Sequence, residues 1–133
     1  MLFFHEITIR VRYQETDAQG HVHHANYLNY FEQGRVELLR AAGHSYRDFE
    51  SQGLMLVVVE VHCRYLGPSQ FDDELTLRTT TEHIRGTRIR HHYHVLRGDT
   101  ILVDATTVVA CVNREGRPQR LPKWLLDAPT AGS

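Results

Sequence analysis

One stretch of this chain, beginning near Asn26, repeats its apolar residues every three or four positions, whereas apolar residues elsewhere mostly alternate with polar ones. The repeat predicts an amphipathic helix, and Gly43 is a natural stop just past its end. The apolar stripe of this helix consists of Tyr27, Tyr30, Phe31, Gly34, Leu38 and Leu39. Tyrosines and a glycine on one stripe predict close packing against a flat surface, such as a sheet.

Alternating segments on both sides of the helix predict the strands of that sheet. They are residues 3–13, 54–65, 75–84, 87–97 and 101–113. The last segment is the most apolar, and we expect it to be the central strand. The element order predicts an α+β fold, in which about five antiparallel strands form a sheet with one long helix across one face.

Two shorter segments complete the predicted domain. Ser45 with Asp48 resembles a capping box and predicts a short second helix, and residues 122–126 add a helical turn. We expect a single domain over residues 1–127 and a flexible tail over residues 128–133. One main helix leaves the other sheet face poorly covered, and dimerisation is an economical way to cover it.

Charge and cysteine content exclude several classes of protein. The chain has 15 Lys and Arg residues against 16 Asp and Glu residues. Its net charge is therefore close to zero, whereas a nucleic-acid-binding protein usually carries an excess of positive charge. No apolar stretch approaches the ~20 residues of a membrane span, and the N-terminus lacks the features of a signal peptide. Cys63 and Cys111 are too few for a disulfide scaffold. We therefore expect a cytoplasmic protein with no membrane span and no nucleic-acid partner.

The segment from Tyr13 to Tyr27 carries the residues best suited to chemistry. Asp17 is followed by Gly20 and then by a helix N-terminus. The first-turn amides of a helix have no internal partner and carry the positive end of its dipole, so they can stabilise a developing oxyanion. A carboxylate beside them can act as nucleophile or general base. The alternative is that Asp17 only caps a turn that Gly20 closes.

This segment resembles a motif of the 4-hydroxybenzoyl-CoA thioesterase family of hotdog-fold enzymes, and it looks most similar to the branch of Tol-Pal-associated acyl-CoA thioesterases. The matching residues are Asp17-x-x-Gly20-His21-Val22-x-His24-x-x-Tyr27-x-x-Tyr30-x-x-x-x-Arg35. The resemblance implies a curved antiparallel sheet wrapped around a central helix, assembled as homodimers or homotetramers with active sites at the dimer interface. It implies hydrolysis of an aryl- or fatty-acyl-CoA thioester to a free acid and CoA, without a cofactor.

The resemblance also assigns residue roles. It places the catalytic carboxylate at Asp17, the backbone N–H that binds the oxyanion at His24, and the loop glycine at Gly20. Asp17 either attacks the thioester to give a mixed anhydride or activates water. Some relatives carry Tyr or Asn at the position of His24, a change that a backbone donor tolerates. The substrate-binding group consists of His21, Asn26 and Tyr27.

Three other functions compete with this one. An acyl carrier protein can replace CoA, which would make the chain an acyl-ACP thioesterase. Hydration or dehydration of acyl thioesters is known on this fold, but the Asp17 loop argues against it because hydratase relatives arrange Asp and His differently. A non-catalytic acyl-CoA-binding protein usually needs an attached module, for which this chain has no room.

Two further groups of side chains suggest ligands. Three arginines flank the turn at Gly86 and are candidates to bind CoA phosphates, the alternative being a solvated strand edge: Arg85, Arg88 and Arg90. His92 and His94 point to one face of a strand, which permits two metal ligands. A zinc site would need a third ligand, which a carboxylate such as Asp17 can in principle supply. We expect no metal.

Simple structural roles account for three other residues that attract notice. Glu32 and Arg35 are three positions apart on the helix and predict an ion pair. Glu15 stands where similar proteins often have Asp, and we expect it to be a solvated loop charge, the alternative being a supporting acid. Trp124 is expected to cap an apolar edge.

Overall fold

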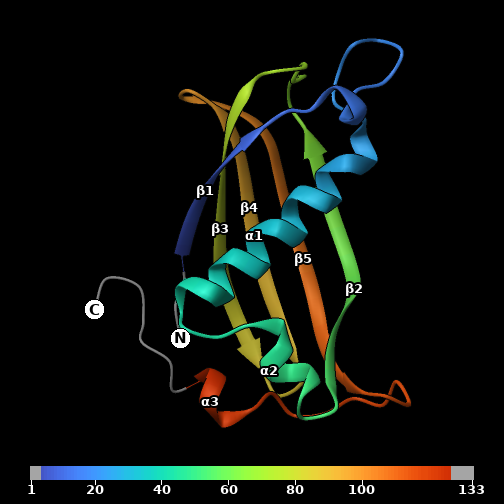
Figure 1. The fold of residues 1–133 in the computed structure, drawn as a ribbon, viewed down its shortest axis with the longest axis vertical. Helices are drawn as coiled ribbons and strands as arrows, with labels where there is room; N and C mark the ends of the chain where they lie inside the picture. The colour runs from blue at the N-terminus through green and yellow to red at the C-terminus, as the bar shows by residue number, and fades with distance from the viewer. Residues whose placement is uncertain (1–3, 127–133) are drawn as a thin grey trace.

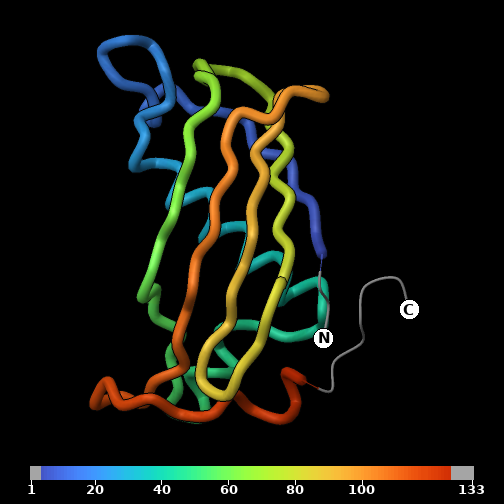
Figure 2. Tube along the Cα trace, turned by 180° about the vertical axis from the view of Figure 1, so that it is seen from behind, coloured from blue at the N-terminus to red at the C-terminus, as the bar shows by residue number. Residues whose placement is uncertain are grey.

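The computed structural model describes residues 4–126 as one antiparallel sheet with a helix laid across it. Helix α1 (Tyr27–Ala41) crosses one face of the sheet (Figure 1), and within the described residues the opposite face carries no helix (Figure 2). The strand order is β1-β3-β4-β5-β2. The strands are β1 (Phe4–Arg10), β2 (Leu54–Tyr65), β3 (Glu74–Arg85), β4 (Arg88–Arg97) and β5 (Thr100–Asn113). The predicted α+β arrangement is confirmed.

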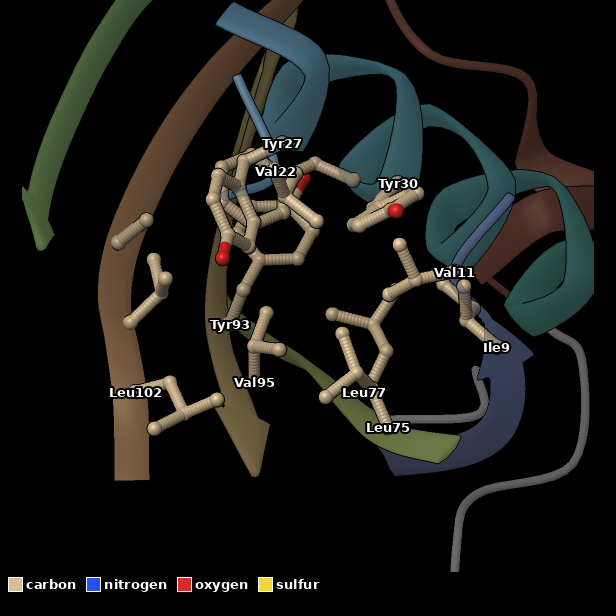
Figure 3. Packing of buried hydrophobic residues seen from close by; sticks show 13 residues of the cluster. Ile9, Val11, Val22, Tyr27, Tyr30, Leu75, Leu77, Tyr93, Val95 and Leu102 are labelled. Atoms are coloured by element: carbon tan, nitrogen blue, oxygen red, sulfur yellow. The ribbon is translucent and has the colours of Figure 1, made fainter. Parts of the chain in front are cut away.

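Helix α1 packs through the predicted stripe, all six residues of which are buried. Figure 3 shows Tyr27 and Tyr30 pointing from α1 into a cluster of strand side chains. At Gly34 the helix comes so close to the sheet that an added Cβ would lie 2.8 Å from Leu77 Cδ2 and closer still to Thr79 Oγ1. Only glycine permits this approach, so Gly34 sets the distance between helix and sheet.

The first strand is shorter than its alternation predicted. It ends at Arg10, and Tyr13 opens a 3-10 turn, η1 (Tyr13–Glu15), where it is 76% exposed instead of sharing the buried face. The chain turns here because the Glu15 carboxylate accepts the Arg12 N–H at 2.8 Å. Backbone hydrogen bonds continue as far as Val11, and at Arg12 a local side-chain bond takes their place. The C-terminal end of helix α1 is as predicted, because Gly43 lies just past it with a φ of +90°.

The most apolar strand, β5, is not the central one, which corrects the sequence prediction. Strand β4 is central, and β5 lies between β4 and the edge strand β2. The apolar character of β5 has a different cause: its 14 residues contribute to both hydrophobic clusters of the domain. Leu102 and Ala105 pack in the cluster beneath the start of α1, and Val109 and Cys111 pack in the cluster beside α2.

Strand β2 forms one edge of the sheet, and together with Leu66, which follows it, exposes an apolar row. Between Val58 and Glu60 the register with β5 shifts, so the predicted alternation is interrupted at Val59. Each side chain in the row is 41–52% exposed: Met55, Val58, Val59, Val61, Tyr65 and Leu66. A long apolar edge strand with unpaired backbone groups is a surface that proteins normally cover.

Two short helices, α2 (Tyr46–Glu50) and α3 (Lys123–Leu126), lie at the end of the sheet away from the loop that precedes α1 (Figure 1). The Asp48 carboxylate accepts the Ser45 N–H at 2.8 Å, which confirms the predicted cap. The Trp124 ring centroid lies 5.0 Å from that of Phe49, so the tryptophan does cap an apolar edge.

Both cysteines are free thiols, in agreement with the expectation of no disulfide scaffold, and burial raises the pKa of Cys63 and of Cys111. Over residues 4–126, no helix combines the length and the apolar character needed to cross a membrane. The tail predicted at residues 128–133 lies outside the described residues.

Candidate active site

The loop between β1 and α1 is fixed to the helix by a buried carboxylate at Glu15. Its Oε1 accepts the Tyr30 hydroxyl at 2.8 Å and the Arg12 N–H at 2.8 Å, and its Oε2 accepts Arg12 Nε at 3.1 Å. Its backbone oxygen accepts the His23 N–H at 2.9 Å. Burial alone would raise the pKa of Glu15, but these hydrogen bonds outweigh it and the pKa is lowered. Glu15 is only 7% exposed, which corrects the prediction of a solvated charge.

Asp17 lies in a tight turn that is held by its own side chain. Its Oδ1 accepts the N–H groups of Gln19 at 2.9 Å and His21 at 3.3 Å, and Gly20 completes the turn with a φ of +80°. Asp17 therefore does cap a turn, as the simpler interpretation held. Only one of its two oxygens is occupied: among the hydrogen bonds of residues 4–126, none uses Oδ2. The turn orients the carboxylate and leaves one oxygen available.

The helix begins with a 3-10 turn, η2 (His24–Asn26), that runs directly into α1. His23 satisfies two amides of this first turn: its ring Nδ1 accepts the Ala25 N–H at 3.1 Å, and its oxygen accepts the Asn26 N–H at 2.9 Å. No acceptor within the described part of the chain takes the N–H of His24. This amide is thus the free donor at the positive end of the helix.

Asp17 and His24 line the same open cleft, whose volume is about 810 Å³ including space open to solvent. One wall comes from the loop and the start of α1, and the other from the end of β2 and the residues after it. The lining residues are Asp17, Gln19, His21, Val22, His24, Tyr27, Tyr65, Leu66, Gly67 and Pro68. The cleft therefore brings a carboxylate and a helix-start amide to one space.

Sequence reasoning missed the second wall of the cleft. Tyr65 donates its hydroxyl to the backbone oxygen of His24 at 2.9 Å, which ties the end of β2 to the helix start. Burial is the main reason that the pKa of Tyr65 is raised to about 12, so the hydroxyl keeps its proton. The one available signal was that Tyr65 shares the alternating face of β2 with Cys63, a face that turns toward α1.

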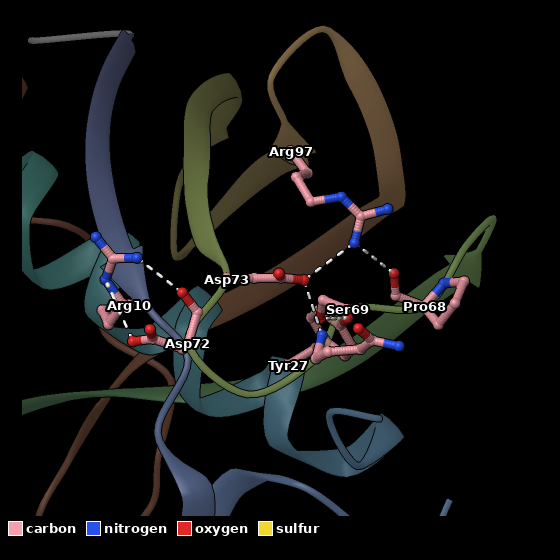
Figure 4. A network of polar contacts seen from close by, with 8 residues as sticks. Arg10, Tyr27, Pro68, Ser69, Asp72, Asp73 and Arg97 are labelled. Atoms are coloured by element: carbon pink, nitrogen blue, oxygen red, sulfur yellow. Dashed lines mark hydrogen bonds and ion pairs between the residues drawn. The ribbon is translucent and has the colours of Figure 1, made fainter. Parts of the chain in front are cut away.

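The floor of the cleft is held by a polar network on the β2–β3 connection (Figure 4). The Tyr27 hydroxyl lies 2.6 Å from Ser69 Oγ, and burial raises the pKa of Tyr27. Arg97 donates to the Asp73 carboxylate at 3.0 Å and to the Pro68 oxygen at 3.3 Å. These contacts hold the connection against the aromatic side chain that lines the site.

The structure does not bring every predicted site residue to the cleft. Asn26 is not among the lining residues, and its Oδ1 accepts Asn29 Nδ2 at 3.0 Å. The three arginines of the predicted CoA-phosphate group lie at the β3–β4 turn, at the opposite end of the sheet from the Asp17 loop (Figures 1 and 2). Within one chain they are far from the cleft, and their role remains a prediction.

One predicted ion pair is wrong, and one residue considered as a third metal ligand lies elsewhere. Arg35 does not pair with Glu32: it is buried beneath α1 and donates to the Tyr93 hydroxyl at 3.0 Å. The buried face of α1 is wide enough to include Arg35, so its guanidinium meets the hydroxyl of Tyr93 on β4 and not the carboxylate of Glu32. The carboxylate beside His92 and His94 is Asp104 of β5, not Asp17, because β4 and β5 pair in that register.

Comparison with known proteins places the chain in a family. Residues 11–128 match the model of the thioesterase-like superfamily. An acyl-CoA thioester hydrolase of Escherichia coli strain CFT073, YbgC, is 32% identical over 120 residues, covering 89% of this chain and 90% of the relative.

Solved structures agree on the fold. A probable thioesterase from Bartonella henselae superposes with a TM-score of 0.86 at 37% identity, covering 90% of this chain and 99% of the other. A DHNA-CoA thioesterase from Staphylococcus aureus superposes with a TM-score of 0.88 at 26% identity, covering 96% and 86%. The predicted hotdog fold is confirmed, and this chain belongs to the thioesterase-like superfamily.

Proposed function

We propose that this protein hydrolyses acyl-CoA thioesters, with the Asp17 carboxylate and the His24 amide as its catalytic groups. The observation that carries the proposal is their shared cleft, in which the Oδ2 of Asp17 and the N–H of His24 are both free of partners within the described residues. The similarity to an acyl-CoA thioester hydrolase over nearly the whole chain supports the same activity.

The reaction follows from the charge that develops on the thioester. When a nucleophile adds to the carbonyl carbon, negative charge builds on the carbonyl oxygen. A backbone N–H at the start of a helix stabilises this charged transition state more strongly than it stabilises the neutral carbonyl of the bound substrate. Asp17 Oδ2 either adds to the carbon itself, giving a mixed anhydride that water then cleaves, or takes a proton from the water that adds. In both routes the C–S bond breaks and the CoA thiolate leaves.

Tyr27 and His21 supply the surroundings of this step. Tyr27 is buried at the base of the cleft and presents an aromatic ring held by Ser69, which suits an acyl group. His21 contributes its N–H to Asp17 Oδ1 and its backbone oxygen to the Asp17 N–H at 2.8 Å, so it shapes the catalytic turn. We assign substrate contact to Tyr27 and positioning of the turn to His21.

We also propose that the active unit is a homodimer that pairs through β2. This edge exposes six apolar side chains beside its unpaired backbone groups, and Tyr65 and Leu66 of that row line the cleft. A two-fold axis through an antiparallel β2–β2 contact would set the start of the partner's β2 beside the end of this one. The β3–β4 turn of the partner, with its three arginines, then approaches the Asp17 end of the first chain. This arrangement would let a basic turn meet CoA phosphates near the cleft.

The direct test is release of free thiol from a panel of benzoyl, naphthoyl, short-chain and long-chain acyl-CoA thioesters. The wild type, Asp17→Asn and the matched control Asp99→Asn, at the β4–β5 turn, are assayed together. We expect turnover by the wild type and the control and its loss in Asp17→Asn. Full activity of Asp17→Asn would refute the mechanism, and absence of turnover on every CoA ester would refute the proposed substrate class.

A further inference from the structure

The outer face of the sheet, turned away from α1, carries a group of three side chains that the proposed reaction does not use. His92 and His94 alternate on β4 with His91 and Tyr93, which are buried beneath the helix. Asp104 lies directly opposite His94 on β5 and points to the same outer face. The pairing register, and not the sequence spacing, is what brings the carboxylate to the two imidazoles.

The three side chains converge on one point. Asp104 Oδ1 lies 2.7 Å from His92 Nε2, and Asp104 Oδ2 lies 3.6 Å from His94 Nε2. The two imidazole centroids are 4.4 Å apart, with the rings nearly perpendicular. One nitrogen from each histidine and one carboxylate oxygen all lie within 4.8 Å of one another. Among residues 4–126, this is the only group of three metal-ligating side chains that meets this condition.

We propose that His92, His94 and Asp104 form a binding site for a divalent transition-metal ion, with Zn²⁺ as the best fit. Two imidazoles and a carboxylate are ligands that zinc accepts, and tetrahedral zinc keeps its ligand atoms roughly 3.3 Å apart, given bonds of about 2.0–2.1 Å. The two nitrogen–oxygen separations, 2.7 Å to Asp104 Oδ1 and 3.6 Å to Asp104 Oδ2, lie on either side of that value. In such a site a water molecule would take the fourth position.

Burial and backbone support favour such a site. The side chains are 26%, 29% and 34% exposed, so they are partly fixed by their neighbours while an ion can still reach them from solvent. Both supporting strands lie inside the sheet and are paired on each side, which holds the ligands on rigid elements. A site on strands is better organised than one on a loop.

Two arginines flank the three side chains on neighbouring strands, and one of them is already paired with a carboxylate. Arg78 of β3 lies beside His94 in the sheet, but its Nε donates to the Glu6 carboxylate at 2.7 Å, so its charge is compensated. Arg64 of β2 is the cross-strand neighbour of Asp104 and is exposed. The competing explanation is that the three side chains form only an ion pair between imidazolium and carboxylate.

This site is separate from the candidate catalytic cleft. Tyr65, on the opposite face of the sheet, pairs with Val103, the residue next to Asp104. The two sites thus use opposite faces of neighbouring residues, and Asp17 has no part in the metal site. Metal binding is therefore expected to survive Asp17→Asn, so a failure of the thioesterase proposal would leave this one standing.

The test is titration of the metal-free protein with Co²⁺, followed by the visible absorption of the protein-bound ion, and then displacement by Zn²⁺. The variants are His92→Gln, His94→Gln and Asp104→Asn, with His83→Gln as a control at an exposed histidine near the end of β3. Circular dichroism of each metal-free variant establishes that it is folded.

We expect one ion per chain for the wild type and for His83→Gln. Losing an outer partner of a metal ligand typically costs roughly 10- to 100-fold in affinity, and loss of a ligand itself is expected to cost at least as much. Affinity that is unchanged in Asp104→Asn or His94→Gln would overturn the proposal, as would a wild type that binds neither Co²⁺ nor Zn²⁺. Either result would leave the ion pair as the role of the group.

Discussion

Two carboxylates in the same loop, Glu15 and Asp17, have opposite surroundings. Glu15 is buried and its two oxygens accept three hydrogen bonds, from Tyr30 and from the backbone and side chain of Arg12. Asp17 is half-buried, uses one oxygen to close a turn and faces the cleft. The fully bonded carboxylate fixes the loop to the helix, and the partly bonded one is left for chemistry. The carboxylate that we propose as catalytic thus lies in a loop that a structural carboxylate two residues away holds in place.

The largest expected effect comes from removing the free backbone N–H of His24, which shares the cleft with Asp17. His24→Pro removes that N–H, and the first position of a helix tolerates proline. His23, with φ −60° and ψ 134°, already has the conformation that a following proline requires. We expect the rate constant kcat for thioester hydrolysis to fall by roughly 10²–10³-fold, the typical cost of losing one oxyanion donor.

The matched control is His24→Ala, which keeps the backbone N–H and is expected to retain most of the activity. Thiol release and far-UV circular dichroism are measured for both variants. Equal activity of the two folded proteins would show that the amide at this position does not stabilise the oxyanion.

A smaller effect is expected on the structural side, from Glu15→Gln. This change leaves one acceptor oxygen, so the hydrogen bonds to that oxygen become neutral and the one to the other oxygen is lost. The free energy of unfolding at pH 7 should therefore fall by about 1–2 kcal/mol. Because the pKa of Glu15 is lowered on folding, its contribution is present above its ordinary value of 4.5 and is lost as pH falls through the lower folded value. Urea unfolding from pH 7 to pH 3 measures both effects.

In the Gln variant, the part of the acid-induced loss that belongs to Glu15 should disappear. An unfolding free energy equal to that of the wild type at pH 7, with the same pH dependence, would show that Glu15 is not the anchor of the loop.

The smallest effect tests the contact between the two walls of the cleft. Tyr65→Phe removes the hydroxyl that binds the His24 oxygen and leaves the ring in place. One ordinary hydrogen bond is worth about 0.5–1.5 kcal/mol, so kcat/KM should fall by a factor of roughly 2–12. Steady-state kinetics on a CoA thioester provides the measurement, and a loss as large as that of His24→Pro would mean that Tyr65 itself takes part in the reaction.

Local patterns were enough to predict the helix stripe, the approach at Gly34 and the bounds of β2. Each of these depends on periodicity or on one residue whose chemistry decides the outcome. The position of β5 was predicted wrongly because apolar character reports burial, whereas strand order depends on which hairpins form. β4 is central because its neighbours in sequence pair on both sides of it.

The candidate site could be predicted only as far as it is local in sequence. Asp17 and His24 lie in one segment, and the structure brings both to one cleft, while their catalytic roles remain a proposal. Tyr65 and Asp104 contact residues that are distant in sequence, namely His24 and the histidines of β4. Only the folded structure shows which groups they meet. Glu15 was misjudged because a loop carboxylate is usually solvated, and its partner Tyr30 lies a full turn into α1.

The most direct test of the central contrast is a paired measurement on Asp17→Asn and Glu15→Gln. Thiol release from the best CoA thioester and the urea unfolding midpoint are measured for both at pH 7. We predict that Asp17→Asn loses activity by about 10²-fold or more with an unchanged midpoint, whereas Glu15→Gln shifts the midpoint and keeps most of its activity while folded. Full activity in Asp17→Asn, or loss of activity in a folded Glu15→Gln with no change in stability, would contradict the assigned roles.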